Sequence, residues 1–390
     1  MLKRQENKQA ANHNTVTEVN ISSTESMEHE NNEINHIDVD MMMTTISNSS
    51  VETRITQHPI KKDAECYAKP ETEDVSLETD KVTVINLIKS DSELSTMTGL
   101  QSFTLLNTIV EVLEKSYPKT FEKSNLKAKG NVIMTYMRIK QNMSYSALAI
   151  LFQISPKHCQ RIFVKTLGML KITLKAMIDW QSRVTISRNL PNYFKGYEDV
   201  RVVLDCTEIH IQHTKCLECQ MSTFSQYKGG LTVKFMTGVS PLGSITYVSK
   251  MYGGKSSDTA IFNQSSLIQL LERGDAIMVD KGFLIEATCQ KNGWKLYRPA
   301  YLRDKQFSKF DADNCCDIAK ARVHIERSNQ RLKVFQLLSS TVSCELHPLL
   351  EDIFIVICAT VNLSSPIIAV KNFMHNTVNT PNESIEINPG

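Results

Sequence analysis

The chain has 390 residues, and its 44 Lys and Arg nearly balance its 42 Asp and Glu. The longest strongly apolar run, residues 353–361, falls well short of the roughly 20 residues that span a bilayer. The polar start lacks the apolar core of a signal peptide. We therefore expect an intracellular protein without a membrane span, whose ten scattered cysteines stay reduced.

The balanced total hides an acidic tail and a basic body. Residues 1–95 hold 9 Lys and Arg and 18 Asp and Glu, so the remainder holds 35 against 24. Residues 1–98 are polar and show no sustained period, which predicts a disordered tail with room for one short helix at 82–89. A basic body suits a polyanionic partner, although this charge is also ordinary for its length.

Helical patterns begin after this tail. Apolar spacing and capping residues predict helices at 103–113, 132–139, 145–152 and 156–170. Ser144 can cap the third helix, and Ser155 with Pro156 can begin the fourth. Two short helices joined by a brief turn predict a helix-turn-helix.

The last of these helices has a polar face that could reach DNA. Its outward residues would be Lys157, His158, Gln160, Arg161 and Lys165. Such side chains can contact phosphates and base edges in a major groove. A plain helical hairpin with a solvated basic face is the alternative that spacing alone leaves open.

Beyond a linker that holds Trp180 and Pro191, strand patterns replace the helical ones. Strands are expected at 201–204, 232–239, 245–250 and 276–279, and a helix at 318–335. Long strands followed by strand–helix alternation predict an α/β fold, a mixed sheet with helices packed on it.

Three acidic residues stand out in this region. Asp205 and Asp280 each follow an apolar strand, where a charge loses hydration unless a partner such as a divalent cation replaces it. Glu326 lies at the edge of the apolar seam of the 318–335 helix. Three carboxylates around two metal ions are a recurring arrangement for cutting phosphodiesters, and oxygen ligands suit Mg²⁺ or Mn²⁺. Each acid alone could equally cap a turn or form a surface ion pair.

Six ordered blocks surround these acids. They are Val203-Leu204-Asp205-Cys206-Thr207-Glu208-Ile209, Thr223–Lys228, Thr232–Gly243, Tyr252–Asp258, Val279-Asp280-Lys281-Gly282-Phe283 and Ala321-Arg322-Val323-His324-Ile325-Glu326-Arg327. In this order and spacing they resemble the Harbinger-related DDE superfamily endonucleases. The likeness extends over residues 100–366, and the helices at 128–170 are similar to the domain that precedes the nuclease in animal members of that family.

The resemblance implies a ribonuclease H-like mixed sheet flanked by helices at 200–366. It implies an all-α helix-turn-helix domain at 99–180 before it, and tails at 1–98 and 367–390 that we expect to be disordered. It further implies a cut-and-paste transposase with two divalent ions, Mg²⁺ or Mn²⁺.

By position in the family blocks, Asp205, Asp280 and Glu326 carry over as the metal ligands. Asp258, Lys228 and Arg322 are candidates for the outer shell of the metals or for phosphate contact, whereas Tyr227 is expected to pack. Double-stranded DNA would be the partner, and nuclear residence follows from that substrate. A second copy and an accessory DNA-binding protein are further partners left open.

Two features depart from the family pattern. Many relatives carry an upstream zinc-binding module, but residues 1–98 contain a single cysteine, Cys66. The series His210-x-x-His213-x-x-Cys216-x-x-Cys219 has ligand types that suit tetrahedral zinc, although ordinary loop cysteines are the favoured interpretation. A domesticated DNA-binding or scaffolding protein without catalysis is therefore the main alternative to an active nuclease, and a nuclease acting on RNA is a third hypothesis.

Overall fold

The structure, a computed structural model, describes residues 84–122, 126–213, 215–300 and 308–366, all of which lie in one compact unit. Residues 1–83 of the predicted N-terminal tail, and the whole predicted tail at 367–390, lie outside the described residues. In the described ranges no helix is long and apolar enough to cross a membrane. The apolar run at 353–361 belongs to a buried helix, α15 (Leu350–Asn362).

The first part of the described chain is helical. Its helices are α1 (Val84–Leu87), α2 (Asp91–Thr98), α3 (Phe103–Ser116), α4 (Pro118–Phe121), α5 (Lys127–Gln141), α6 (Tyr145–Phe152), α7 (Pro156–Leu174) and α8 (Arg183–Arg188), with 3-10 turns η3 (Lys175–Met177) and η4 (Asn192–Phe194). The expectation that the tail reaches residue 98 was wrong. Ser90 and Glu93 form a capping box at the start of α2, and Leu94 and Leu100 are fully buried. A helix this short, with few apolar anchors, produces no sustained period in the sequence.

The predicted caps of the helix-turn-helix are confirmed. Ser144 Oγ accepts a hydrogen bond from the backbone N–H of Ala147, and Ser155 Oγ accepts one from that of His158. Between α6 and α7, Gln153 adopts a left-handed conformation with φ of 53°, which lets the chain turn within three residues. The second helix continues to Leu174, beyond its predicted end near residue 170.

The sheet has seven described strands. They are β1 (Val200–His210), β2 (Phe224–Ser225), β3 (Gly230–Val239), β4 (Ile245–Val248), β5 (Tyr252–Gly253), β6 (Ala276–Met278) and β7 (Lys295–Tyr297). The central strand β1 pairs antiparallel with β3 and parallel with β6, which in turn pairs parallel with β7. The strands β2, β4 and β5 pair antiparallel with β3. The predicted mixed sheet is therefore confirmed.

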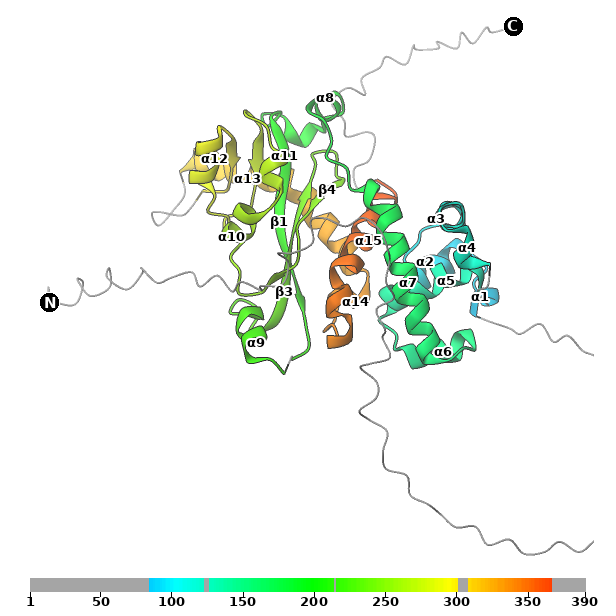
Figure 1. Cartoon of the computed structure of the whole chain (residues 1–390). Helices are drawn as coiled ribbons and strands as arrows, with labels where there is room; N and C mark the ends of the chain where they lie inside the picture. Colours follow the sequence, from blue (N-terminus) through cyan, green and yellow to red (C-terminus); the bar gives the residue numbers. More distant parts are fainter. Residues whose placement is uncertain (1–83, 123–125, 214, 301–307, 367–390) are drawn as a thin grey trace, which may run out of the picture. The chain divides into compact units, whose positions relative to one another are not determined.

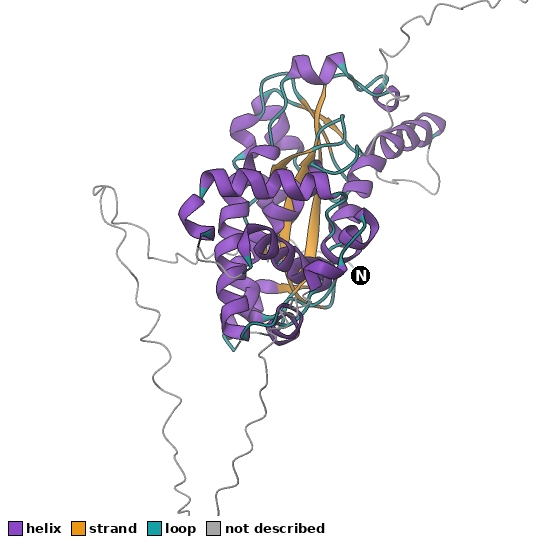
Figure 2. Cartoon of the chain, turned by 90° about the vertical axis from the view of Figure 1, so that its right-hand side faces the viewer, coloured by secondary structure: helices purple, strands orange, loops and turns teal. Residues whose placement is uncertain are grey.

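Different helices cover the two faces of this sheet, as Figures 1 and 2 show. The remaining elements are α9 (Leu217–Thr223), α10 (Asp258–Gln264), α11 (Leu267–Leu270), α12 (Glu286–Asn292), α13 (Lys309–Lys333), α14 (Gln336–Ser339) and η5 (Cys344–Leu349). Val203 and Ile209 of β1 share a core with α13 and α15. Val202 and Leu204 instead share a core with α10, α11 and α12. Side chains of a strand alternate between faces, so Asp205 is on the α13 face and Cys206 is on the α10 face.

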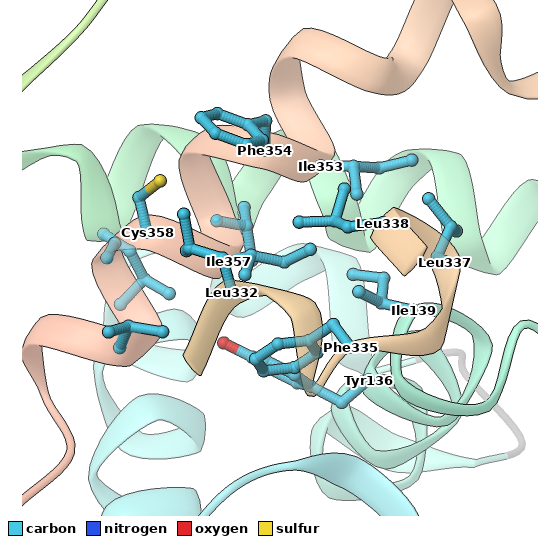
Figure 3. Packing of buried hydrophobic residues seen from close by; sticks show 14 of the residues in the cluster. Tyr136, Ile139, Leu332, Phe335, Leu337, Leu338, Ile353, Phe354, Ile357 and Cys358 are labelled. Carbon is cyan, nitrogen blue, oxygen red and sulfur yellow. The ribbon is translucent and has the colours of Figure 1, made fainter. Parts of the chain in front are cut away.

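The α13 face continues into the helical part of the chain. The predicted seam of the 318–335 helix is buried throughout. Its residues are Ile318, Ala321, Ile325, Ser328 and Leu332 of α13, and Phe335, which follows the end of α13 at Lys333. Leu332 and Phe335 meet Ile357 of α15 and Tyr136 of α5 in one core (Figure 3). The Tyr136 hydroxyl lies 2.8 Å from Thr360 Oγ1, and both residues are fully buried. This core therefore joins the helix that precedes the helix-turn-helix to the last helix of the sheet region.

Candidate active site

Asp205 lies within β1 and not at its end, because the strand continues to His210. Asn329 Nδ2 of α13 donates to Asp205 Oδ2 at 2.6 Å, and the Cys206 backbone N–H donates to Asp205 Oδ1 at 2.9 Å. Burial, together with the negative charge of Glu326, raises the pKa of Asp205 to about 6 from an ordinary 3.8. The site is thus anchored on a partly buried carboxylate whose charged form a nearby positive charge would stabilise.

The other two predicted acids lie on the same face of the sheet. Val279 packs in the α10-side core, so the chain turns the next residue, Asp280, toward α13. Arg322 Nη1 of α13 donates to Asp280 Oδ1 at 2.8 Å, and Arg322 Nη2 lies 3.6 Å from Glu326 Oε1. The negative charges of Glu326 and Asp280 both raise the pKa of Asp205. The structure therefore brings the three predicted acids together around one guanidinium group.

The donor set fits a divalent cation by its chemistry. Three carboxylates gather on one face, and desolvation together with the charges of Glu326 and Asp280 destabilises the charged form of Asp205, which a cation would relieve. As they stand, however, no three acidic, histidine or cysteine side chains of the described residues form a group that could hold a metal ion. Asp280 and Glu326 are more than half exposed and both contact Arg322. These two side chains would have to leave Arg322 to complete the site.

Asn329 is a site residue that the sequence places beside Glu326 as an amide neighbour, without assigning it a contact with Asp205. Its Nδ2 is on Asp205, and its Oδ1 accepts from the Thr207 hydroxyl at 3.3 Å. The two bonds fix the amide orientation and tie α13 to β1 at the carboxylate. The only signal in the sequence was its spacing, three residues after Glu326 and thus on the same side of the helix.

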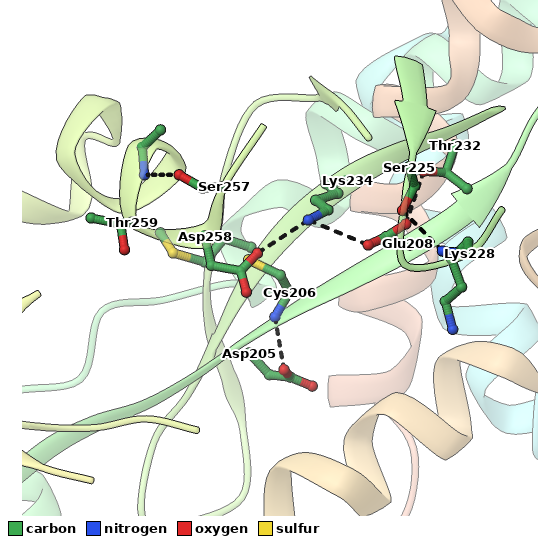
Figure 4. A network of polar contacts seen from close by, with 12 residues as sticks. Asp205, Cys206, Glu208, Ser225, Lys228, Thr232, Lys234, Ser257, Asp258 and Thr259 are labelled. Atoms are coloured by element: carbon green, nitrogen blue, oxygen red, sulfur yellow. Dashed lines mark hydrogen bonds and ion pairs between the residues drawn. The ribbon is translucent and has the colours of Figure 1, made fainter. Parts of the chain in front are cut away.

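Asp258 belongs to a different cluster, on the opposite face of β1 (Figure 4). Lys234 Nζ lies 3.4 Å from Asp258 Oδ1 and 3.3 Å from Glu208 Oε1, and the Thr232 hydroxyl donates to Glu208. The buried stem of Lys234 places its charge between two acids on the α10 side. The expectation that Asp258 serves the outer shell of the metals is therefore not met in this arrangement, because the sheet separates it from Asp205.

Lys228 and Tyr227 lie in the turn between β2 and β3. Tyr227 was expected to pack, but 84% of it is exposed, and Lys228 Nζ sits 4.9 Å from the centre of its ring. That expectation was wrong because a match between an aromatic residue and a family block does not indicate that the side chain is buried. Lys228 is exposed and remains a candidate for phosphate contact.

The predicted DNA-facing residues of α7 are arranged as the spacing indicated. Lys157, Gln160, Arg161 and Lys165 are exposed and His158 is partly exposed. The opposite side of the helix, with Phe163 and Leu167, is fully buried. A basic face is therefore free to meet a partner along the N-terminal half of α7.

The candidate zinc series divides between two elements. His210 ends β1, whereas Cys216 caps α9 by accepting from the backbone N–H of Cys219 at 3.4 Å. Both thiols are exposed. Among the described residues, the histidines and cysteines of this series form no group that could hold a metal ion.

Comparisons with known proteins agree with this arrangement. Residues 204–362 match the family model of the DDE superfamily endonuclease, and residues 124–176 match that of the helix-turn-helix of DDE superfamily endonuclease. The first match contains all three acids, and the second contains α6 and α7. The chain therefore contains the endonuclease domain of the DDE superfamily, preceded by the helix-turn-helix of that superfamily. Neither the curated proteins nor the solved structures gave a significant match.

Proposed function

We propose that this protein cuts double-stranded DNA with a two-metal site held by Asp205, Asp280 and Glu326. The proposal is carried by one observation, that β1, the loop after β6 and α13 bring exactly these family-matched acids to one face of the sheet. When bound, Mg²⁺ or Mn²⁺ would activate a water or a 3′-hydroxyl for attack and stabilise the leaving oxygen. Such a site supports both hydrolysis and strand transfer.

The chain's own residues have separate tasks in this proposal. Asp205 is the fixed ligand, because a central strand and Asn329 restrain it. Asp280 and Glu326 are the exposed acids that would complete the metal site when they leave Arg322. The basic face of α7, with Arg161 and Lys165, binds the duplex and holds it for cutting. Nuclear residence is part of the same proposal, since that is where the substrate is.

The test is cleavage of duplex DNA that carries any terminal inverted repeats found beside the coding sequence. Nicking is measured with Mg²⁺ or Mn²⁺ for the wild type, for Asp280→Asn and for Asp317→Asn. Asp317 is a matched control, since it is an exposed acid of α13 whose salt bridge, among the described residues, is with a surface lysine three residues away. We expect Asp280→Asn to abolish nicking and Asp317→Asn to leave it unchanged.

Two outcomes would contradict the proposal. Equal nicking by the wild type and Asp280→Asn would show that these acids do not catalyse cutting. Tight, salt-sensitive DNA binding by a wild type that never cuts would favour the domesticated DNA-binding protein. Replacing the duplex with RNA of the same sequence tests whether RNA is the substrate.

A further inference from the structure

Arg322 occupies an unusual place for a positive charge in a metal-dependent site. Its side chain is 11% exposed, whereas the two carboxylates that it contacts, Asp280 and Glu326, are 55% and 58% exposed. Its charge also acts on Asp205, whose pKa it lowers against the stronger effect of burial. One guanidinium group therefore offsets part of the charge of all three acids.

Apart from the two acids, no other group among the described residues anchors the guanidinium of Arg322. Its Nε is buried and has no hydrogen-bond partner among the described residues. A buried, unpaired N–H costs free energy, so the ion pair with the two acids has to compensate for it. Any change that removes those acids from Arg322 leaves a charged group that needs a new anionic partner.

We propose that Arg322 is a displaceable counter-ion that couples metal loading to DNA binding. Without a metal ion it bridges Asp280 and Glu326; when a divalent cation takes these carboxylates, the guanidinium is released and binds a DNA phosphate beside the site. The inference rests on the proposed function, since it takes the three acids as the metal ligands. A guanidinium is suited to this exchange, because its planar donors pair equally well with carboxylate and phosphate.

Two consequences follow from this exchange. The arginine and the cation compete for the same acids, so removing the arginine should strengthen metal binding. The cation frees an arginine for DNA, so each ligand should strengthen the binding of the other, as linkage requires. An arginine with a purely structural role would give neither effect.

The first experiment measures Mn²⁺ affinity from the electron paramagnetic resonance signal of the free ion. Arg322→Met keeps the length of the side chain without its charge, and Arg327→Met removes an exposed charge one residue past Glu326 as the matched control. Coulomb repulsion over a few ångströms predicts about tenfold tighter binding for Arg322→Met, even in a water-like dielectric, and less than about threefold for Arg327→Met. Arg322→Lys, which keeps the charge, should remain near the wild type and guards against misfolding of the methionine variant.

The second experiment measures DNA affinity against salt, with Ca²⁺ or with EDTA. For the wild type, Ca²⁺ should steepen the salt dependence by about one phosphate contact. In Arg322→Met this increment should vanish, and in Arg327→Met it should persist. An increment that survives in Arg322→Met, or Mn²⁺ affinity equal to or weaker than the wild type in that variant, would overturn the inference.

An Asp205→Asn variant separates this inference from the proposed function. If Mn²⁺ binding is lost in Asp205→Asn but unchanged in Arg322→Met, the acids hold the metal and only the counter-ion role is wrong. If Asp205→Asn binds Mn²⁺ as the wild type does, the proposed metal site itself is wrong, and the counter-ion role is refuted with it.

Discussion

The buried hydrogen bond between Tyr136 and Thr360 makes an asymmetric prediction about stability. Thr360 has one hydroxyl proton, which it donates to the Val356 carbonyl at 2.7 Å. Tyr136 must therefore donate to Thr360 Oγ1, and burial, which raises the pKa of Tyr136 well above its ordinary value, keeps the phenol protonated. Which hydroxyl donates in this hydrogen bond therefore determines which of the two substitutions costs less stability.

Removing the donor, the Tyr136 hydroxyl, leaves no buried hydrogen-bond donor without an acceptor. In Tyr136→Phe the threonine hydroxyl still donates to Val356, so the loss should be about 1 kcal/mol, the net value of one hydrogen bond. In Thr360→Val the phenol O–H remains fully buried without an acceptor, which costs about 1–3 kcal/mol in addition to the lost bond. The double variant should be no less stable than Thr360→Val alone, since the stranded phenol is gone.

Urea denaturation, followed by far-ultraviolet circular dichroism and by tryptophan fluorescence, measures these differences as a double-mutant cycle. Coincident transitions of the two signals would justify a two-state treatment. Equal losses in the two single variants, or a larger loss in Tyr136→Phe, would refute the reasoning about the proton. A double variant whose loss of stability equals the sum of the two single losses would show that the two groups do not act as a pair.

Three further predictions concern other parts of the molecule. Burial lowers the pKa of His324 to about 4 from 6.5, so the unfolded chain binds the proton at a higher pH than the folded protein does. The free energy of unfolding should therefore fall as the pH drops from 6.5 to about 4. In acid denaturation with EDTA present, His324→Phe should lose less stability over this range than the wild type. A Cβ on Gly254 would lie 2.0 Å from a threonine hydroxyl, so Gly254→Ala should cost about 1–3 kcal/mol in urea denaturation, whereas Gly168→Ala, in open space, should not destabilise the protein. Arg161→Ala should weaken DNA binding and reduce its salt slope by about one, whereas Lys320→Ala on α13 should change neither.

The sequence predicted elements better than it predicted contacts. Caps such as Ser144 and Ser155 act through a neighbouring N–H two or three residues away, so local sequence contains the whole interaction. The apolar seam of α13 follows from a period of the helix itself, as the burial of Ile325 and Leu332 confirms.

What could not be predicted depends on pairing between distant segments. The amide of Asn329 reaches Asp205 across 124 positions, and Lys234 meets Asp258 only because β3 lies between β1 and β5. The side of the sheet on which Asp258 lies is set by how distant strands pair, and no local sequence pattern encodes that pairing. The boundary at residue 98 failed for a related reason, since the burial of Leu94 depends on helices that follow it in the chain.

The helix α13 carries both the apolar seam of the core and the polar groups around the three acids. A rotation of this helix that withdrew Glu326 would also expose Ile325 and Leu332, so its orientation is set by the folding free energy of the whole sheet region. Such a protein can lose catalysis through one substituted side chain while its fold persists. A copy that had drifted into a purely DNA-binding role would therefore keep the shape of the site long after losing its chemistry, which means that the identity of the side chains, and not the presence of the fold, distinguishes an active copy from a silent one.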